Sequence, residues 1–162
     1  MGMVKLLSAL LLLHSCFIFP LSGATLTVLV IETGIREPRP VQEFSGLWEN
    51  TLMDVFFDAG HIVSNAPIMQ IDTKPEGEFP DAAQGAFKEA IAGGSDFLIL
   101  ALVDYQGTAE AAPPLSTLKV FRLSPYRCVA EQQYPKTLSR FPAEEVLELK
   151  KAARTLLAHL RG

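Results

Sequence analysis

Two histidines, one cysteine and scattered carboxylates are the side chains after residue 24 that could carry out chemistry. A zinc site needs several histidines or cysteines at short spacings, and neither His61 nor His159 has such a neighbour in the sequence. Cys128 with either histidine would form a thiol dyad, but no third orienting group and no signature of a cysteine nucleophile accompany them. The sequence therefore predicts no metal, no cofactor and no enzymatic activity. We expect His61 to cap the last carbonyls of a helix.

The carboxylates form no recognisable catalytic pair, but one of them stands where open α/β sheets bind ligands. Asp104 and Tyr105 directly follow the most apolar run, residues 97–103, which has the pattern of a buried strand. Ligands of such sheets bind beyond the C-terminal ends of the strands. Asp104 and Tyr105 are therefore the candidate ligand-site residues. The alternative is that Asp104 only anchors the turn that follows the strand.

The sequence "GGSD" at residues 93–96 has the composition of a catalytic or phosphate-binding turn. A nucleophile elbow and a phosphate-binding loop both lie after a strand and before a helix. Ser95 has the reverse order, because it follows a predicted helix and precedes a predicted strand. The loop after the first predicted strand contains one glycine, Gly34, and lacks the spacing of a dinucleotide-binding turn. We therefore interpret residues 93–96 as a helix-to-strand connection and expect no nucleotide site.

Hydrophobic periodicity predicts the elements that would position these residues. Apolar residues at spacings of three and four indicate three amphipathic helices, the second of them capped by Asp81. Apolar and β-branched runs indicate about five strands, the last two joined as an antiparallel hairpin. The order β-α-β-α-β-β-β-α over residues 25–162 predicts a single α/β domain, a layered sandwich with a mixed sheet. The expected strands are residues 25–31, 61–65 (with a continuation to 71), 97–103, 118–123 and 127–134, and the expected helices are residues 44–59, 81–92 and 142–160.

The aromatic and thiol side chains have a structural and a functional interpretation. Trp48, Phe56 and Phe57 on the first predicted helix could stack on a ligand. Aromatic residues at helical spacing lie far more often in the core, which is what we expect here. Cys128 is interpreted as a small buried hydrophobe, and an intermolecular disulfide is the alternative.

The first 24 residues have the plan of a secretory signal peptide. One lysine precedes an apolar run, and Ser22, Gly23 and Ala24 are small residues of the kind that a signal peptidase reads. We expect cleavage between Ala24 and Thr25, and hence an exported, periplasmic protein. One alternative is an uncleaved N-terminal anchor. Another is a lipoprotein anchored at Cys16, because residues 13–16 resemble a bacterial lipobox.

The charge balance argues against a nucleic-acid partner. The chain carries 14 basic and 18 acidic residues, which gives a formal net charge of −4. Loss of Lys5 with the signal peptide would make the balance more negative still. An acidic chain is not attracted as a whole to nucleic acid or to anionic lipid. We therefore expect contact with the membrane only through the signal peptide or through a lipid on Cys16.

Three stretches carry a resemblance to a group of envelope proteins. A first helix ends in "DAGHIVSN", a second ends in "AIAGGSDFLILALV", and a hairpin precedes a last helix with "KKAARTLLAHL". This order resembles the periplasmic α/β domains of the TolB amino-terminal domain, the curli secretion lipoprotein CsgG and the penicillin-binding-protein activator LpoB. Ala101 stands where the group often has glycine, and neither a propeller nor long membrane hairpins follow. The resemblance implies an envelope protein that binds or scaffolds other proteins.

Three functions are compatible with these observations. The first is a non-enzymatic periplasmic binding or assembly module for envelope proteins, with residues 32–41 and 106–116 as contact loops. The second is a small secreted ligand-binding protein or enzyme with a site near Asp104. The third is a subunit that forms oligomers through the edge of the hairpin, because unpaired strand edges attract partners.

Overall fold

The two most apolar segments of residues 25–162 form the two central strands of a sheet. The computed structural model describes residues 23–35, 43–72, 80–105, 116–134 and 142–160. Strand β1 (Thr25–Thr33) lies parallel to β4 (Phe97–Asp104), with Leu26 opposite Phe97 and Thr33 opposite Asp104. Both strands are buried almost throughout, because helices cover both faces of the sheet.

Four further strands complete a mixed sheet of the predicted class. Strands β2 (Ile62–Asn65) and β3 (Met69–Ile71) both pair with β1 in parallel. Strand β5 (Ser116–Leu123) runs antiparallel to β4, and β6 (Tyr126–Gln133) runs antiparallel to β5. The order is β2-β1-β4-β5-β6, with β3 beside β1. The predicted continuation to residue 71 is a separate strand, because Pro67 has no N–H to donate to the ladder.

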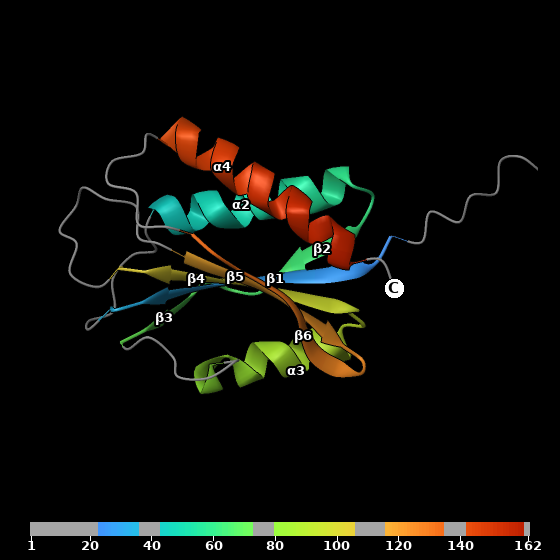
Figure 1. The fold of residues 1–162 in the computed structure, drawn as a ribbon. Helices are drawn as coiled ribbons and strands as arrows, with labels where there is room; N and C mark the ends of the chain where they lie inside the picture. Colours follow the sequence, from blue (N-terminus) through green and yellow to red (C-terminus); the bar gives the residue numbers. More distant parts are fainter. Residues whose placement is uncertain (1–22, 36–42, 73–79, 106–115, 135–141, 161–162) are drawn as a thin grey trace, which may run out of the picture.

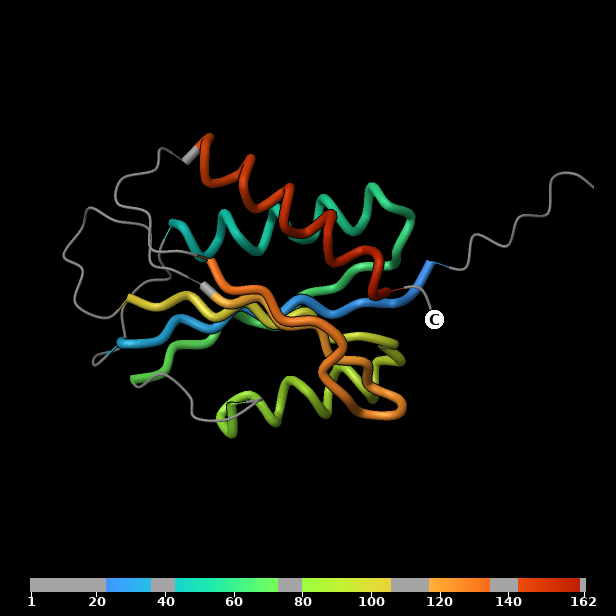
Figure 2. The backbone as a smooth tube through the Cα atoms, in the orientation of Figure 1, coloured from blue at the N-terminus to red at the C-terminus, as the bar shows by residue number. Residues whose placement is uncertain are grey.

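Three helices cover the two faces of the sheet unequally. Helices α2 (Glu43–Asp58) and α4 (Pro142–Leu156) lie together on one face, and α3 (Gln84–Ala92) lies alone on the other (Figures 1 and 2). Short 3₁₀ turns, η1 (Asp81–Ala83) and η2 (Leu157–His159), precede α3 and follow α4. The prediction of a layered α/β sandwich is confirmed. No helix in the described ranges is long and apolar enough to cross a membrane.

Each face of the sheet has its own hydrophobic cluster, because side chains alternate along a strand. One cluster joins the sheet to α2 and α4, and the other joins it to η1 and α3. Strand β4 contributes Phe97, Ile99, Ala101 and Val103 to the first cluster and Leu98, Leu100 and Leu102 to the second.

Trp48 ties the two helices of the first face together. Its side chain is 2% exposed, and its Nε1–H donates a hydrogen bond to Glu145 Oε1 on α4 at 3.1 Å. The indole also meets the ring of Tyr134 edge to face, with centroids 5.4 Å apart. The prediction that Trp48 lies in the core is confirmed. Phe57 differs, because it lies on the solvent side of α2 and is 69% exposed.

The glycines of "GGSD" form the end of α3, as the sequence predicts. Gly94 adopts a φ of +78°, its N–H donates to Ile91 O at 3.0 Å, and the N–H of Ser95 donates to Ala90 O at 2.9 Å. This pair of hydrogen bonds is a Schellman motif, which ends a helix with a left-handed residue. Gly60 closes α2 with a φ of +88°.

Replacing Gly94 with alanine tests that assignment. A Cβ at Gly94 would meet no atom within 4 Å, so the expected cost is the strain of a left-handed alanine alone, about 1 kcal/mol of unfolding free energy. Gly85→Ala is the matched control, because Gly85 also has open space but lies inside α3, where alanine is the better helix former by roughly 0.5 kcal/mol. Urea denaturation should show a lower free energy of unfolding for Gly94→Ala and a higher one for Gly85→Ala. An equal loss of unfolding free energy in both variants would contradict the assignment.

Two capping predictions are wrong. No side-chain hydrogen bond caps η1, and Asp81 Oδ1 instead accepts one from Gln84 Nε2 at 3.3 Å. The imidazole of His61 does not cap the carbonyls of α2. Its Nδ1 accepts a hydrogen bond from the N–H of Ala24 at 3.0 Å, at the start of the sheet.

Cys128 is half-buried, whereas the sequence predicts a buried side chain. Its Sγ donates a hydrogen bond to Ala130 O at 3.4 Å.

Hydrogen bonds join Ala24 and Thr25, at the start of the sheet, to the segments on both sides of β1. The carbonyl of Ala24 accepts from the N–H of Ile62 at 3.1 Å, next to the bond to His61. Thr25 and Asp96 exchange two hydrogen bonds, one between backbones and one from Thr25 N–H to Asp96 Oδ2, both 2.8 Å long. Cys16 and residues 1–22 of the predicted signal peptide lie outside the described residues.

Candidate functional site

Asp104 and Tyr105 lie at the C-terminal end of β4, but they do not converge on one site. Tyr105 packs on the cluster beneath α2, and its hydroxyl lies 2.9 Å from Ser45 Oγ. Its N–H donates to Thr33 O at 3.0 Å, which extends the ladder of β1. Asp104 continues the alternation of β4 and therefore belongs to the face that carries α3. The described contacts of Tyr105 are those of a residue that fastens α2 to the sheet.

A buried glutamate lies near the same end of the sheet. The sequence places Glu32 in a loop, whereas β1 extends through Thr33 and buries the Glu32 side chain completely. Gln70 of β3 stands opposite Glu32 in the register, and its Nε2 donates to Glu32 Oε2 at 2.8 Å. This hydrogen bond offsets part of the cost of burying a carboxylate. The pair fastens β3 to β1.

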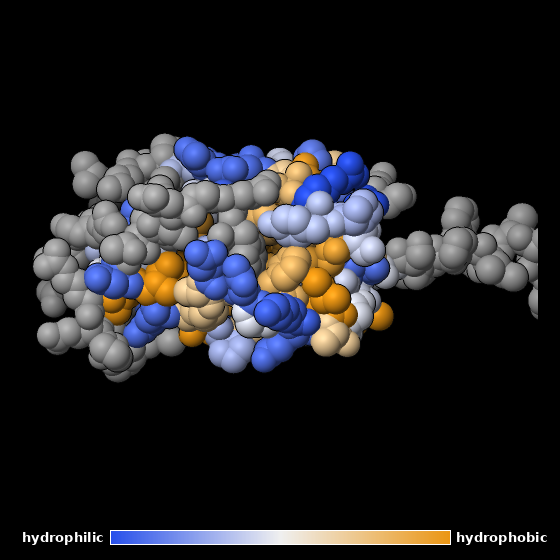
Figure 3. All heavy atoms as spheres, turned by 90° about the horizontal axis from the view of Figure 1, so that it is seen from below, coloured by the Kyte–Doolittle hydropathy of each residue, from blue (hydrophilic) through white to orange (hydrophobic). Residues whose placement is uncertain are grey.

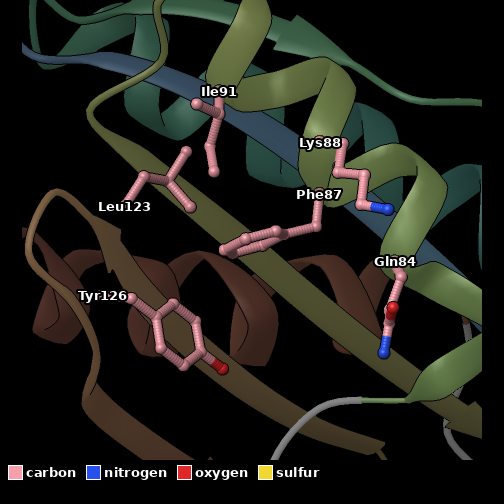
Figure 4. A pocket seen from close by; sticks show the side chains of 6 residues that line it. All are labelled: Gln84, Phe87, Lys88, Ile91, Leu123 and Tyr126. Carbon is pink, nitrogen blue, oxygen red and sulfur yellow. The ribbon is translucent and has the colours of Figure 1, made fainter.

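Six residues line an apolar groove on the other face of the sheet, between α3 and the β5–β6 hairpin. Its volume is about 370 Å³, and we call it the α3 groove. Figure 4 shows the Phe87 ring extending from α3 toward the hairpin, where Leu123 and Tyr126 stand on either side of the turn. The lining residues are Gln84, Phe87, Lys88, Ile91, Leu123 and Tyr126.

Ring contacts hold the groove in shape. The rings of Phe87 and Tyr126 meet edge to face with centroids 5.2 Å apart, and Tyr126 also stacks on Phe121 at 5.8 Å. Ile91 and Tyr126 nevertheless keep 47% of their surfaces exposed. Exposed apolar side chains around a preformed hollow, with a lysine at the rim, are typical of a surface that binds an apolar group of another molecule.

A second groove lies on the opposite side of α3, against β1 and β2, and threonine and serine hydroxyls contribute to its lining. Its volume is about 320 Å³. The hydroxyl of Thr27 lies 3.1 Å from that of Ser64 and 2.7 Å from that of Ser95, so these groups bond one another. Among the described residues that line this groove there is no histidine. Figure 3 shows the face that carries both grooves, with apolar atoms gathered in patches between polar ones.

Sequence reasoning missed the α3 groove. The spacing of apolar residues predicts that Ala83, Phe87, Ala90 and Ile91 all lie on the inner side of the second helix. In the structure Ala90 is buried and Ile91 is exposed. The spacing of Phe87 and Ile91, four residues apart on one helix, was an available signal for a shared apolar face.

Among the described residues, no group of three or more histidine, cysteine, aspartate or glutamate side chains could hold a metal ion. The predicted contact loops fall mainly on residues 36–41 and 106–115, outside the described residues.

Solved structures that match the chain include three with sequence identities of 17% or less. A variant of the PelC dodecamer from Paraburkholderia phytofirmans is 13% identical, with a TM-score of 0.46 over 86% of this chain and 90% of that chain. A second PelC dodecamer from the same organism is 12% identical, with a TM-score of 0.42 over 86% and 89%. Protein XCC0632 from Xanthomonas campestris is 17% identical, with a TM-score of 0.36 over 90% and 86%.

A search of curated proteins finds no match to the chain. A family model described as "Uncharacterised protein" matches residues 38–120, which is about half of the sequence. The matched range runs from just before α2 into β5, so it includes the central strand β4 and the whole of α3. The chain belongs to this family of uncharacterised proteins.

Proposed function

We propose that this protein is an exported, non-enzymatic binding module of the cell envelope, and that it docks a partner protein in the α3 groove. Export rests on the signal-peptide pattern of residues 1–24, and the envelope setting rests on the resemblance to the TolB, CsgG and LpoB group. Both of these remain predictions. The observation that carries the binding proposal is the α3 groove, with two apolar side chains, Ile91 and Tyr126, each half exposed.

The chemistry of the groove defines the kind of partner that fits it. Its floor and walls are the side chains of Phe87, Leu123 and Tyr126, which favour an apolar or aromatic anchor from the partner. Lys88 lies at the rim on α3 and favours an acidic residue beside that anchor. The partner is therefore expected to present an apolar side chain next to a carboxylate.

Site-specific crosslinking in intact cells tests this proposal. A photo-crosslinking residue at position 91 should capture one envelope protein, whereas the same residue at position 147 should not. Leu147 is the matched control, because it is an exposed leucine, 54% accessible, on α4 at the opposite face. Ile91→Asp should then weaken binding of the captured protein at least tenfold, because a charged group would be placed in an apolar groove, and Leu147→Asp should leave it unchanged.

The result that would overturn the proposal is equal capture at positions 91 and 147, or a partner whose affinity is the same for Ile91→Asp and for the unmodified protein. Circular dichroism of each variant separates loss of binding from loss of folding. Tyr126→Ser provides a second groove variant outside α3, in case Ile91→Asp fails to fold.

A further inference from the structure

A third hollow lies on the opposite face of the sheet from the two grooves beside α3. Three basic side chains contribute to its lining. Its volume is about 370 Å³, and Arg122 of β5, Arg127 of β6 and His159 of η2 contribute to its lining. The hairpin and the C-terminal end of α4 lie at the same end of the molecule, which brings these three residues together (Figure 1). We call this hollow the basic pocket.

Phe97 positions the first arginine of the pocket. The guanidinium carbon of Arg122 lies 5.2 Å from the centroid of the Phe97 ring, within the range of a cation–π contact. The Nε of Arg122 is buried and has no hydrogen-bond partner among the described residues. A buried N–H without an acceptor is costly, so the guanidinium of Arg122 lacks one of the partners that would stabilise its charge.

The second arginine stands directly opposite the first. Arg122 and Arg127 are Cα partners in the antiparallel register, so both side chains emerge on the same face of the sheet. Like charges at directly opposed positions destabilise a sheet. Among the described residues, no carboxylate lines the pocket, and the ion pairs join Lys119 to Glu131 and Lys151 to Glu148. Within this part of the chain, two arginines thus lie side by side with no counter-charge between them.

We infer that the basic pocket binds a phosphate-type oxyanion, held by the guanidinium groups of Arg122 and Arg127 with His159 at its side. Guanidinium groups present paired N–H donors that match the oxygens of phosphate. A dianion would neutralise the charges of both arginines. This inference is independent of the α3 groove, because the pocket lies on the other face of the sheet and shares no lining residue with it.

Calorimetric titration of the full chain with inorganic phosphate tests the inference, at an ionic strength held constant with chloride. We expect saturable binding with a dissociation constant below about 1 mM, and at least tenfold weaker binding for Arg127→Gln and for Arg122→Lys. Arg122→Lys keeps the charge but loses the fork of donors. Arg154→Gln is the matched control, because Arg154 is an exposed arginine of α4 outside the pocket.

A parallel arm distinguishes a free phosphate from a lipid headgroup. Vesicles of phosphatidylglycerol mixed with phosphatidylcholine are compared with vesicles of phosphatidylcholine alone. Binding to the anionic vesicles that is lost in Arg127→Gln, with no binding of free phosphate, assigns the pocket to a lipid phosphate. Binding of free phosphate assigns it to a soluble ligand.

Thermal stability provides a second readout, with and without phosphate. Without phosphate, Arg127→Gln should melt at a higher temperature than the unmodified protein, because one of two opposed charges is removed. Phosphate should raise the melting temperature of the unmodified protein and of Arg154→Gln, but not that of Arg127→Gln. Absence of binding to both phosphate and anionic vesicles, or equal weakening by Arg127→Gln and Arg154→Gln, would overturn the inference.

Discussion

Trp48→Ala is expected to lower the free energy of unfolding by about 4 kcal/mol, because it empties a large volume between α2, α4 and the sheet. Trp48 is 2% exposed and contacts both Glu145 on α4 and the Tyr134 ring. Urea denaturation followed by circular dichroism measures the change. Tryptophan fluorescence cannot follow unfolding of the variant, since Trp48 is the sole tryptophan of the chain.

Trp48→Phe separates packing from the hydrogen bond. Phenylalanine retains most of the ring volume but has no N–H for Glu145, whose side chain is buried. We expect a loss of about 2 kcal/mol, the cost of removing a hydrogen bond to a buried polar group. Substitutions at exposed sites change the free energy of unfolding by no more than roughly 0.5 kcal/mol. A change that small for Trp48→Ala would contradict a core role for this residue.

Phe121→Ala is expected to have two effects, loss of stability and loss of the α3 groove. Phe121 is fully buried, so its removal should cost about 4 kcal/mol. It also supports the Tyr126 ring, which lies parallel to it with centroids 5.8 Å apart. Without that support Tyr126 would lose its fixed position opposite Phe87, and crosslinking from position 91 to the partner should fall sharply. Crosslinking yield and urea denaturation are measured on the same preparation.

Leu118→Ala is the control for the second effect. Leu118 lies on the same strand as Phe121 and is equally buried, but it belongs to the cluster beneath α2 and α4. Its truncation should destabilise the protein by about 3 kcal/mol and leave the groove intact. If the crosslinking yield of both variants falls in proportion to their loss of unfolding free energy, Phe121 has no specific role in the groove.

The central part of the fold could be predicted because its signals are local. An apolar run at residues 97–103 marks a strand that is buried on both faces, and glycines in left-handed conformation mark the ends of α2 and α3. The prediction for Ile91 is wrong for a physical reason. Ala90 and Ile91 are both apolar, but successive residues of a helix point about 100° apart, so the sheet buries only one of them.

The surface sites could not be predicted because they join residues that are distant in sequence. Phe87 meets Tyr126 where the hairpin curls toward α3, and the register of the hairpin shifts between Val120 and Phe121. Such an irregularity increases the local twist of a strand and has no clear signature in the sequence. Asp104 and Tyr105 show the opposite case. The sequence predicts their place at the C-terminal end of the central strand, but alternation along the strand directs their side chains to different faces of the sheet.

The hydrogen bonds at the start of β1 give the predicted processing step a structural consequence. Cleavage between Ala24 and Thr25 would convert the Thr25 amide, which donates to Asp96 Oδ2, into an ammonium group facing a carboxylate. The hydrogen bond would then join two opposite charges, and their Coulombic attraction, screened by solvent at this exposed position, would add to it. The same cleavage would remove the bonds of Ala24 to His61 and Ile62. Cleavage would thus strengthen the attachment of β1 on the side of β4 and weaken it on the side of β2. Export and the stability of the β2 edge of the sheet would then be linked.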